Sequence, residues 1–267
     1  MKFEPIYQCD LEEIKHLQPD DWNDIIPEIE FYIRSTFCFP VKVSMDNCIV
    51  GIGAAIVYDT TAWLAHIIVD RAYRNRGIGF QIVQELLRKN ENTRIKTYLL
   101  TATELGKPVY TRAGFRPVAE YVFMNREKAI PEETSSTPII PFEERYRRQV
   151  LQMDRRVSAE NREFLISGAI HDAKLYTEGD DLSGFFIPGL GEGPVVADTA
   201  EAGLELMKIK CPSVNRVVLP ADNLTGIQFL HQKGFVPTAV KGTRMILGKD
   251  LNWQPTKIYS RIGGNFG

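Results

Sequence analysis

The sequence predicts an α/β protein made of two copies of one lobe, and three observations support this fold class. A helical stripe, a hairpin and a buried strand follow one another in residues 22–69. A glycine loop at residues 71–79, RAYRNRGIG, joins that strand to a second helical pattern. Finally, AGFRPVA at residues 113–119 recurs as KGFVPTA at residues 233–239. A motif repeated within such an order indicates a duplicated structural unit.

The elements of the first lobe are predicted in chain order from hydrophobic periodicity. A helix is expected where apolar side chains share one stripe: Trp22, Ile25, Ile26, Ile29 and Ile33. A hairpin with its turn at Asn47 follows, because VKVSMD and IVGIGAAIVYD are apolar runs on either side. AWLAHIIV, residues 62–69, is typical of a strand covered on both faces. Next come a helix from residue 80, a strand at 95–101, a short helix at 105–112 and a strand at 115–124.

A linker is predicted at residues 131–141, because PEETSSTPIIP is rich in Pro, Ser and Thr. The expected domains are therefore residues 1–130 and residues 142–267. The helix expected after the linker also carries arginines, which we interpret as a solvated face rather than as a second anion site: Arg145, Arg147, Arg148, Arg155 and Arg156.

Composition excludes several classes of protein. The chain has 267 residues, of which 44% are hydrophobic and 25% charged, and its formal net charge of −2 argues against general nucleic-acid binding. The four cysteines form no CxxC pair, so a structural zinc site is not expected. We expect a cytoplasmic protein with reduced cysteines. No signal peptide and no membrane-spanning run is predicted.

The loop RAYRNRGIG crowds like charges at the start of a helix. Arg71, Arg74 and Arg76 stand where unpaired N–H groups and the helix dipole already present positive charge. This arrangement is costly unless an anion occupies it, and a phosphate or pyrophosphate is the natural ligand. Gly77 and Gly79 would let the backbone approach that ligand closely.

Two common nucleotide motifs do not explain this loop. A dinucleotide fingerprint would need glycine where Ile82 stands. A P-loop would need Lys and then Ser or Thr where Phe80 and Gln81 stand. Chemistry alone therefore predicts a phosphate group without naming its carrier.

The repeat supplies an internal control for these positions. With Gly114 placed on Gly234, an offset of 120 residues, RNRGIG falls on PVVADT and Tyr110 falls on Leu230. The second copy keeps GFxPxA but lacks the arginines, the glycines and the phenol. The fold therefore does not require these groups, which favours a ligand-binding role for them in the first lobe.

The buried strand, the RxxGxG loop, the helix and the later VYTRAGF together resemble the GNAT superfamily of acyl-CoA-dependent N-acyltransferases. Residues 74–79 match its pyrophosphate loop and residues 110–115 match its YxxxGF signature, although Arg71 stands where proline is frequent. The resemblance covers most of residues 1–128, and the whole chain looks like two-lobed GNAT proteins with a degenerate second lobe. It implies a mixed, mostly antiparallel twisted sheet flanked by helices in each lobe.

The resemblance also implies roles for individual residues. The strand before the loop would splay from its neighbour, so that the backbone of Ile68 polarises the thioester carbonyl. Tyr110 would be the general acid for the departing thiolate, and Leu230 at the matching position indicates that packing does not demand the hydroxyl. The implied contacts with acetyl-CoA are Ile67, Ile68, Val69, Arg74, Asn75, Arg76, Gly77, Ile78, Gly79 and Phe80.

The base and the acceptor pocket are less determined. His66 lies beside the implied thioester and is a candidate base, although a histidine in an apolar strand is more often a hydrogen-bonded core residue. Trp63, Glu30 and Tyr32 are candidates for the lining of the acceptor pocket.

The predicted function is direct transfer of an acetyl group from acetyl-CoA to a primary amine of a small molecule, such as an amino acid or a polyamine. A longer acyl group, a protein-lysine acceptor and a non-catalytic acyl-CoA sensor stay open. The second lobe is not expected to bind CoA productively. Its expected role is to close the acceptor pocket, to support the sheet or to mediate homodimer formation. No metal, nucleic acid or membrane partner is expected.

Overall fold

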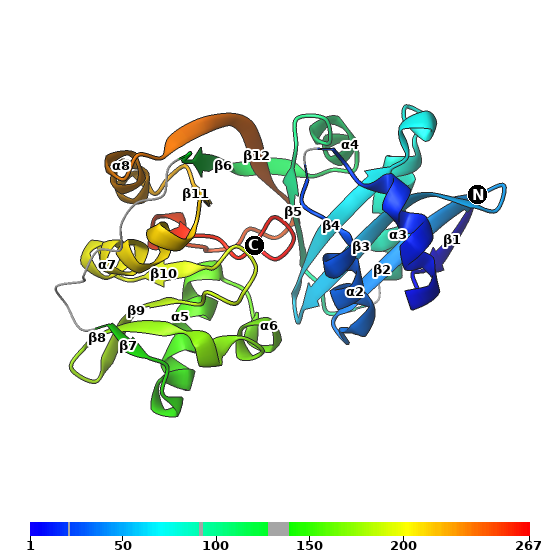
Figure 1. Cartoon of the computed structure of the whole chain (residues 1–267). Coiled ribbons are helices and arrows are strands. Elements are labelled where there is room, and N and C mark those ends of the chain that lie inside the picture. The colour runs from blue at the N-terminus through cyan, green and yellow to red at the C-terminus, as the bar shows by residue number, and fades with distance from the viewer. Residues whose placement is uncertain (21, 91–92, 128–138) are drawn as a thin grey trace. The chain divides into compact units, whose positions relative to one another are not determined.

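The computed structural model describes residues 1–20, 22–90, 93–127 and 139–267, which divide into two compact units (Figure 1). The first unit contains residues 1–117 and 245–249 together with Phe266. The second unit contains residues 118–244 and 250–265 together with Gly267. Both units combine β-sheet and α-helix, and the fold class predicted from the sequence is confirmed.

The first unit is built on a mixed sheet in which strands β1 to β5 follow one another in order. β1 to β4 pair in antiparallel fashion, and β4 pairs with β5 in parallel. β1 is a strand that periodicity missed. The strands are β1 (Lys2–Pro5), β2 (Cys38–Met45), β3 (Cys48–Tyr58), β4 (Thr61–Val69) and β5 (Thr97–Ala102). The helices are α1 (Leu11–Ile14), α2 (Ile26–Arg34), α3 (Ile78–Lys89) and α4 (Lys107–Arg112).

Local sequence explains the β2–β3 turn and the close packing of α3, and the structure corrects the predicted start of α2. The β2–β3 hairpin turns at Asp46 and Asn47, whose φ angles of 51° and 64° suit the two-residue turns that connect twisted strands. Gly53 of β3 lets α3 pack closely, because a Cβ there would lie 2.5 Å from Cγ2 of Ile82. The stripe predicted from Trp22 was too long, since α2 begins only at Ile26 and Trp22 lies in the preceding loop.

The second unit contains a five-stranded sheet in the order β13-β10-β9-β8-β7 and a set of three neighbouring strands in the order β12-β6-β11. The strands are β6 (Arg116–Asn125), β7 (Ile139–Pro141), β8 (Lys174–Glu178), β9 (Asp181–Phe186), β10 (Val195–Ala197), β11 (Arg216–Pro220), β12 (Val236–Gly248) and β13 (Ile258–Ser260). The helices are α5 (Arg147–Ser158), α6 (Glu163–Ser167), α7 (Ala200–Lys210) and α8 (Leu224–Gln232). Single 3-10 turns cover Gln8–Asp10, Lys15–Leu17, Arg71–Tyr73, Glu144–Tyr146, Ile170–Asp172, Cys211–Ser213 and Pro255–Lys257.

The repeated GF motif forms the same turn twice. Gly114 and Gly234 both have positive φ angles, 94° and 79°. The following phenylalanines are buried, and the N–H of Phe115 donates to the carbonyl of Tyr110 at 3.0 Å, as that of Phe235 does to Leu230 at 2.9 Å. Equal hydrogen bonds at equal offsets indicate that the motif is a helix-to-strand turn in both lobes.

The strands that follow these turns belong to the opposite units. β6 follows Phe115, yet residues 118–125 lie in the second unit and pair with β11. β12 follows Phe235, yet residues 245–249 lie in the first unit, where Met245 joins the apolar core. The units therefore divide at residue 117, whereas the sequence predicts the end of the first lobe at residue 130. Residues 131–138 of the predicted linker lie outside the described residues, and its residues 139–141 form β7.

Candidate active site

The candidate site starts at a bulge in β4. Ile52 pairs with Ile68 and Ala54 with Ala65, so His66 and Ile67 together oppose the single residue Gly53. His66 has a φ of 48°, a left-handed conformation that costs about 1–3 kcal/mol in a residue other than glycine. The parallel ladder to β5 joins only residues 61–63 to residues 97–99. Past that ladder, β4 carries the bulge and leads into the glycine loop.

The antiparallel ladder indicates which backbone groups point away from β3. The N–H of Asp70 donates to the carbonyl of Val50 at 2.9 Å, and alternation directs the N–H of Ile68 to the same side. The carbonyl of Val69 instead accepts a bond from Nε of Arg74 at 3.1 Å. This alternation favours the N–H groups of Ile67 and Val69 as donors toward β5, in place of Ile68, which the sequence suggested.

The glycine loop leaves the start of α3 open. Asn75 and Gly77 have φ angles of 61° and 80°, and Gly77 is the N-cap residue of α3. Gly77 has no side chain to cap the helix, and no heavy atom lies within 4 Å of where its Cβ would be. The loop is exposed from Arg74 to Gly77. The first N–H groups of α3 can therefore meet a ligand from solvent.

The three arginines of the loop are not equivalent. Arg71 pairs with Asp20, so its charge is neutralised, contrary to the expectation that all three charges crowd. Arg74 bonds the carbonyl of Val69, and the guanidinium of Arg76 lies 5.1 Å from the ring centre of Tyr73. Within the described part of the chain, neither Arg74 nor Arg76 forms an ion pair with a carboxylate. These two guanidiniums are the positive charges available to an anion.

The second lobe closes the corresponding helix start, which lies at Thr199, 122 residues after Gly77. The ungapped offset of 120 residues is therefore wrong at this place, because residues 195–197 of PVVADT form β10. Thr199 is the N-cap residue of α7, and its hydroxyl accepts the N–H of Ala202 at 3.2 Å. The last strand, β13, pairs with β10. Directly after it, the N–H of Arg261 donates to the carbonyl of Val218 in β11 at 3.0 Å. The two strands that correspond to β4 and β5 are thus bridged by the chain itself.

Tyr110 lies on α4, next to the helix that leaves the loop. A Cβ at Gly79 would lie 4.0 Å from Cγ1 of Val109, and the guanidinium of Arg112 lies 4.2 Å from the ring centre of Phe80. Tyr110 itself is partly buried, and burial raises the pKa of its phenol to about 12. The structure therefore brings the glycine loop, the end of β4 and the helix of Tyr110 together in one unit.

His66 is a hydrogen-bonded residue of an aromatic cluster. Its Nδ1 lies 2.9 Å from the hydroxyl of Tyr32, and its ring meets Tyr32 and Trp22 edge-on at centroid distances of 5.5 and 5.8 Å. Burial lowers the pKa of His66 to about 4, which makes the imidazole a weak base. Trp22 is 39% exposed and was missed as a site residue, because it was assigned to a helix stripe.

The three residues predicted to line the acceptor pocket differ in their exposure to solvent. Trp63 and Tyr32 have no exposed surface, so neither lines an open pocket. Glu30 lies at the surface, pairs with Arg34 and accepts a bond from Nε2 of Gln8 at 3.1 Å. These contacts correct the expectation that Trp63 and Tyr32 line the acceptor site.

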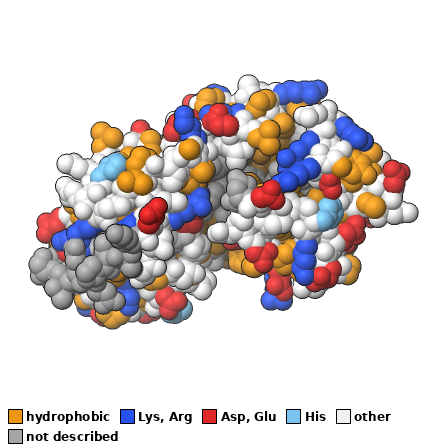
Figure 2. Space-filling model, turned by 45° about the horizontal axis from the view of Figure 1, so that its top comes forward, with side chains coloured by type: hydrophobic (Ala, Val, Ile, Leu, Met, Phe, Trp, Pro, Cys, Tyr) orange, Lys and Arg blue, Asp and Glu red, His pale blue; other side chains and the backbone are white. Residues whose placement is uncertain are grey.

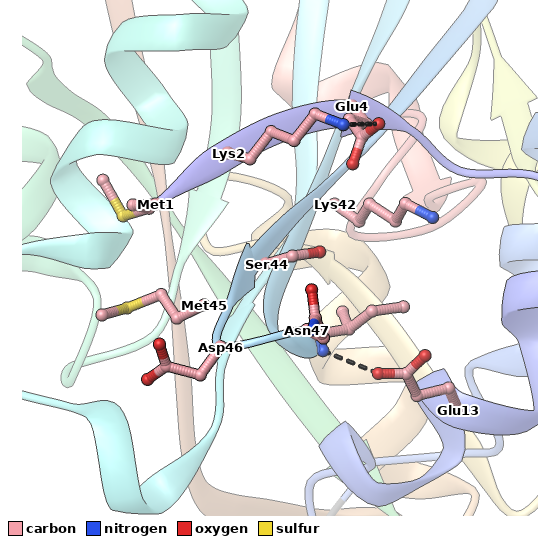
Figure 3. A pocket seen from close by; sticks show the side chains of 10 residues that line it. Met1, Lys2, Glu4, Glu13, Lys42, Ser44, Met45, Asp46 and Asn47 are labelled. Carbon is pink, nitrogen blue, oxygen red and sulfur yellow. Dashed lines mark hydrogen bonds and ion pairs between the residues drawn. The ribbon is translucent and has the colours of Figure 1, made fainter.

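A pocket of about 400 Å³ lies elsewhere in the first unit, against β1 and β2 (Figure 3). Its charges are largely matched: Lys2 pairs with Glu4 at 2.7 Å, Lys42 pairs with Asp10 at 2.6 Å, and Glu13 accepts the N–H of Ile49 at 2.7 Å. It contains none of the predicted site residues. Across the described residues, no cluster of His, Cys, Asp and Glu suits a metal ion, and no helix is long and apolar enough to cross a membrane.

Comparison with known proteins links this geometry to a family. The model of the acetyltransferase (GNAT) family matches residues 3–115. A search of curated proteins found no sequence match. A proposed acetyltransferase from Pyrococcus horikoshii has a similar fold, with a TM-score of 0.81 at 17% identity, over 100% of this chain and 95% of that chain.

Two further structures resemble most of the chain. A proposed acetyltransferase from Thermoplasma acidophilum has a TM-score of 0.58 at 12% identity, over 93% of this chain and 100% of that chain. A GCN5-related N-acetyltransferase from Anabaena variabilis has a TM-score of 0.54 at 12% identity, over 92% of this chain and 72% of that chain. Residues 3–115, which match the model of the acetyltransferase (GNAT) family, hold the bulged strand, the open glycine loop and Tyr110.

Proposed function

We propose that the chain is an acetyl-CoA-dependent N-acetyltransferase whose first unit transfers the acetyl group directly to a primary amine of a small molecule. The contrast between two helix starts carries the proposal. α3 begins at the uncapped Gly77 beside Arg74 and Arg76, whereas Thr199 caps α7. An uncapped N-terminus beside two guanidiniums suits a pyrophosphate, which acetyl-CoA carries.

The mechanism that these residues support is direct attack. The N–H groups of Ile67 and Val69 would hold and polarise the thioester carbonyl, so that a neutral amine attacks its carbon. The C–S bond then breaks, and Tyr110 gives its proton to the thiolate. Its raised pKa keeps the phenol protonated at neutral pH. The proton lost by the attacking nitrogen returns to the phenol through water.

His66 is better suited to positioning than to proton transfer. An amine with a pKa of about 10.4 is not deprotonated efficiently by an imidazole whose pKa is about 4. The bond to Tyr32 instead fixes the bulge residue in its left-handed conformation. We therefore propose that water, rather than His66, accepts the proton of the acceptor ammonium.

Two matched arginine variants test the binding part of the proposal. Arg74→Ala should weaken acetyl-CoA binding about fivefold to tenfold, because it removes a charge-assisted contact with the pyrophosphate. Arg71→Ala removes the same charge from the same loop, but this guanidinium is paired with Asp20, so the affinity of this variant for acetyl-CoA should stay within about twofold of the wild type. Calorimetry that finds equal losses in both variants, or no binding by the wild type, would reject the site.

A screen of amines with acetyl-CoA, read out as thiol release, tests catalysis. Turnover of any small amine supports the enzyme. Binding of acetyl-CoA without turnover of small amines or of lysine peptides would favour a non-catalytic sensor, and turnover of lysine peptides alone would favour a protein acetyltransferase. A cytoplasmic location and a homodimer stay predictions.

A further inference from the structure

We propose that a basic groove on α5 and α6 of the second unit binds an acidic peptide segment of a partner protein. The groove encloses about 430 Å³ and is lined by five arginines and two glutamates, with Leu151 and Gln152 between them. Its volume is sufficient for several side chains of a ligand. Neither the acetyl-transfer site nor the glycine loop contributes to it.

The arginines of this region differ in whether they form an ion pair with a carboxylate of the chain. Arg145 pairs with Glu143 at 3.0 Å, and the buried Arg162 pairs with Asp154 at 2.6 Å. Outside the groove, Arg156 on α5 pairs with Asp198 at 2.7 Å. Arg147 pairs with Glu144. Each of these four arginines therefore has a carboxylate partner within the chain.

Arg148 and Arg155 differ from these four in their ion pairing. Both line the groove and both are exposed, and within the described ranges neither has a carboxylate within ion-pair distance. Figure 2 shows Lys, Arg, Asp and Glu interspersed in small patches over one face of the molecule. Two guanidiniums without an ion pair in one hollow can receive anions from outside.

The spacing of Arg148 and Arg155 favours a peptide over a single anion. They stand two turns apart on α5, about 10 Å along the helix axis, and Leu151 lies half-buried between them. In a polyproline II segment, which has three residues per turn and a rise of 3.1 Å, carboxylates three residues apart share one face at a similar spacing of about 9 Å. Phe164 follows the groove residue Glu163 and is 79% exposed. Arg and Phe are both enriched in protein interfaces.

Fluorescence anisotropy tests the proposal on the full chain. The probe is a short labelled peptide with two glutamates three residues apart and a leucine between them, and the same peptide with glutamines is the reference. The acidic peptide should bind at low salt, and the variant Arg148→Ala/Arg155→Ala should weaken this binding about tenfold. Arg156→Ala is the control for each single variant, Arg148→Ala or Arg155→Ala, because it removes one charge from the same helix outside the groove.

Each outcome decides the question. A tenfold loss in the double variant, with an unchanged far-UV spectrum and unchanged acetyl transfer, supports the groove. Losses in Arg156→Ala equal to those in the single variants, or equal binding of the glutamine peptide, would overturn it. Stronger competition by a short RNA or by inorganic pyrophosphate than by unlabelled acidic peptide would also overturn it, because it would assign the two arginines to phosphates.

Discussion

Cutting the chain after residue 130 should unfold the first unit, although residues 1–130 contain the whole lobe predicted from the sequence. The cut removes the end of β12, where Met245 is 1% exposed and Leu247 packs against the same core. Burial of two such side chains contributes about 3–6 kcal/mol. The bonds of Lys249 with Lys96 and Thr97, at 3.1 and 2.8 Å, add about 1 kcal/mol each. Domains of this size are stable by only about 5–15 kcal/mol.

The first lobe's own strand is a poor replacement for β12. At the offset of 120 residues, Asn125 and Glu127 would stand where Met245 and Leu247 pack. Burying an amide and a carboxylate in an apolar core costs several kcal/mol unless both find partners. Refolding of β6 onto β5 should therefore not rescue the fragment.

A chimera provides the matched control for this truncation. Joining Phe115 directly to Val236 and ending at Asp250 keeps the shared GF turn and supplies Met245 and Leu247 in a chain of the same length as residues 1–130. The chimera should unfold cooperatively, with a Tm at least about 20 °C above that of residues 1–130. Thermal unfolding followed by circular dichroism measures both. If residues 1–130 unfold as cooperatively and at the same temperature as the chimera, the assignment of β12 to the first core is wrong.

Three further predictions concern the site. Tyr110→Phe should lower kcat about a hundredfold and leave the KM for acetyl-CoA within about twofold, as measured by steady-state kinetics; an unchanged kcat would remove Tyr110 from the mechanism. The pKa of His66 falls to about 4 from its ordinary 6.5, so the unfolded chain binds the proton more tightly and stability should fall by about 1–2 kcal/mol as the pH drops from 6.5 to 4. His66→Asn, which tolerates positive φ, should flatten that dependence in urea titrations. Calorimetry should find one acetyl-CoA per chain, and two would contradict the closed second lobe.

The sequence predicted well those features that depend on residues close together in the chain. The strand, the loop and α3 are consecutive, so hydrophobic periodicity and the glycines of residues 77 and 79 were sufficient to place the open helix start. The pairing of Arg71 with Asp20 was not predictable, because the partners lie 51 residues apart. Trp22 was misplaced because an apolar stripe continues past the true start of a helix when the preceding loop also packs. The bond from Tyr32 to His66 depends on a contact between a helix and a bulge that no spacing reveals.

The repeat predicted that the second lobe lacks the groups of a CoA site, and the structure adds a physical reason why that site would not form. Loss of Gly77 and the arginines from the second copy would by itself leave an open helix start. Thr199 satisfies the N–H of Ala202 in that copy, so an incoming pyrophosphate would have to displace an existing bond. β13 and Arg261 bridge β10 and β11, the strands between which a thioester would lie. Restoring glycine and arginine to residues 194–199 should therefore not create a second site, because residues 195–197 form the paired strand β10 and β13 would still fill the space.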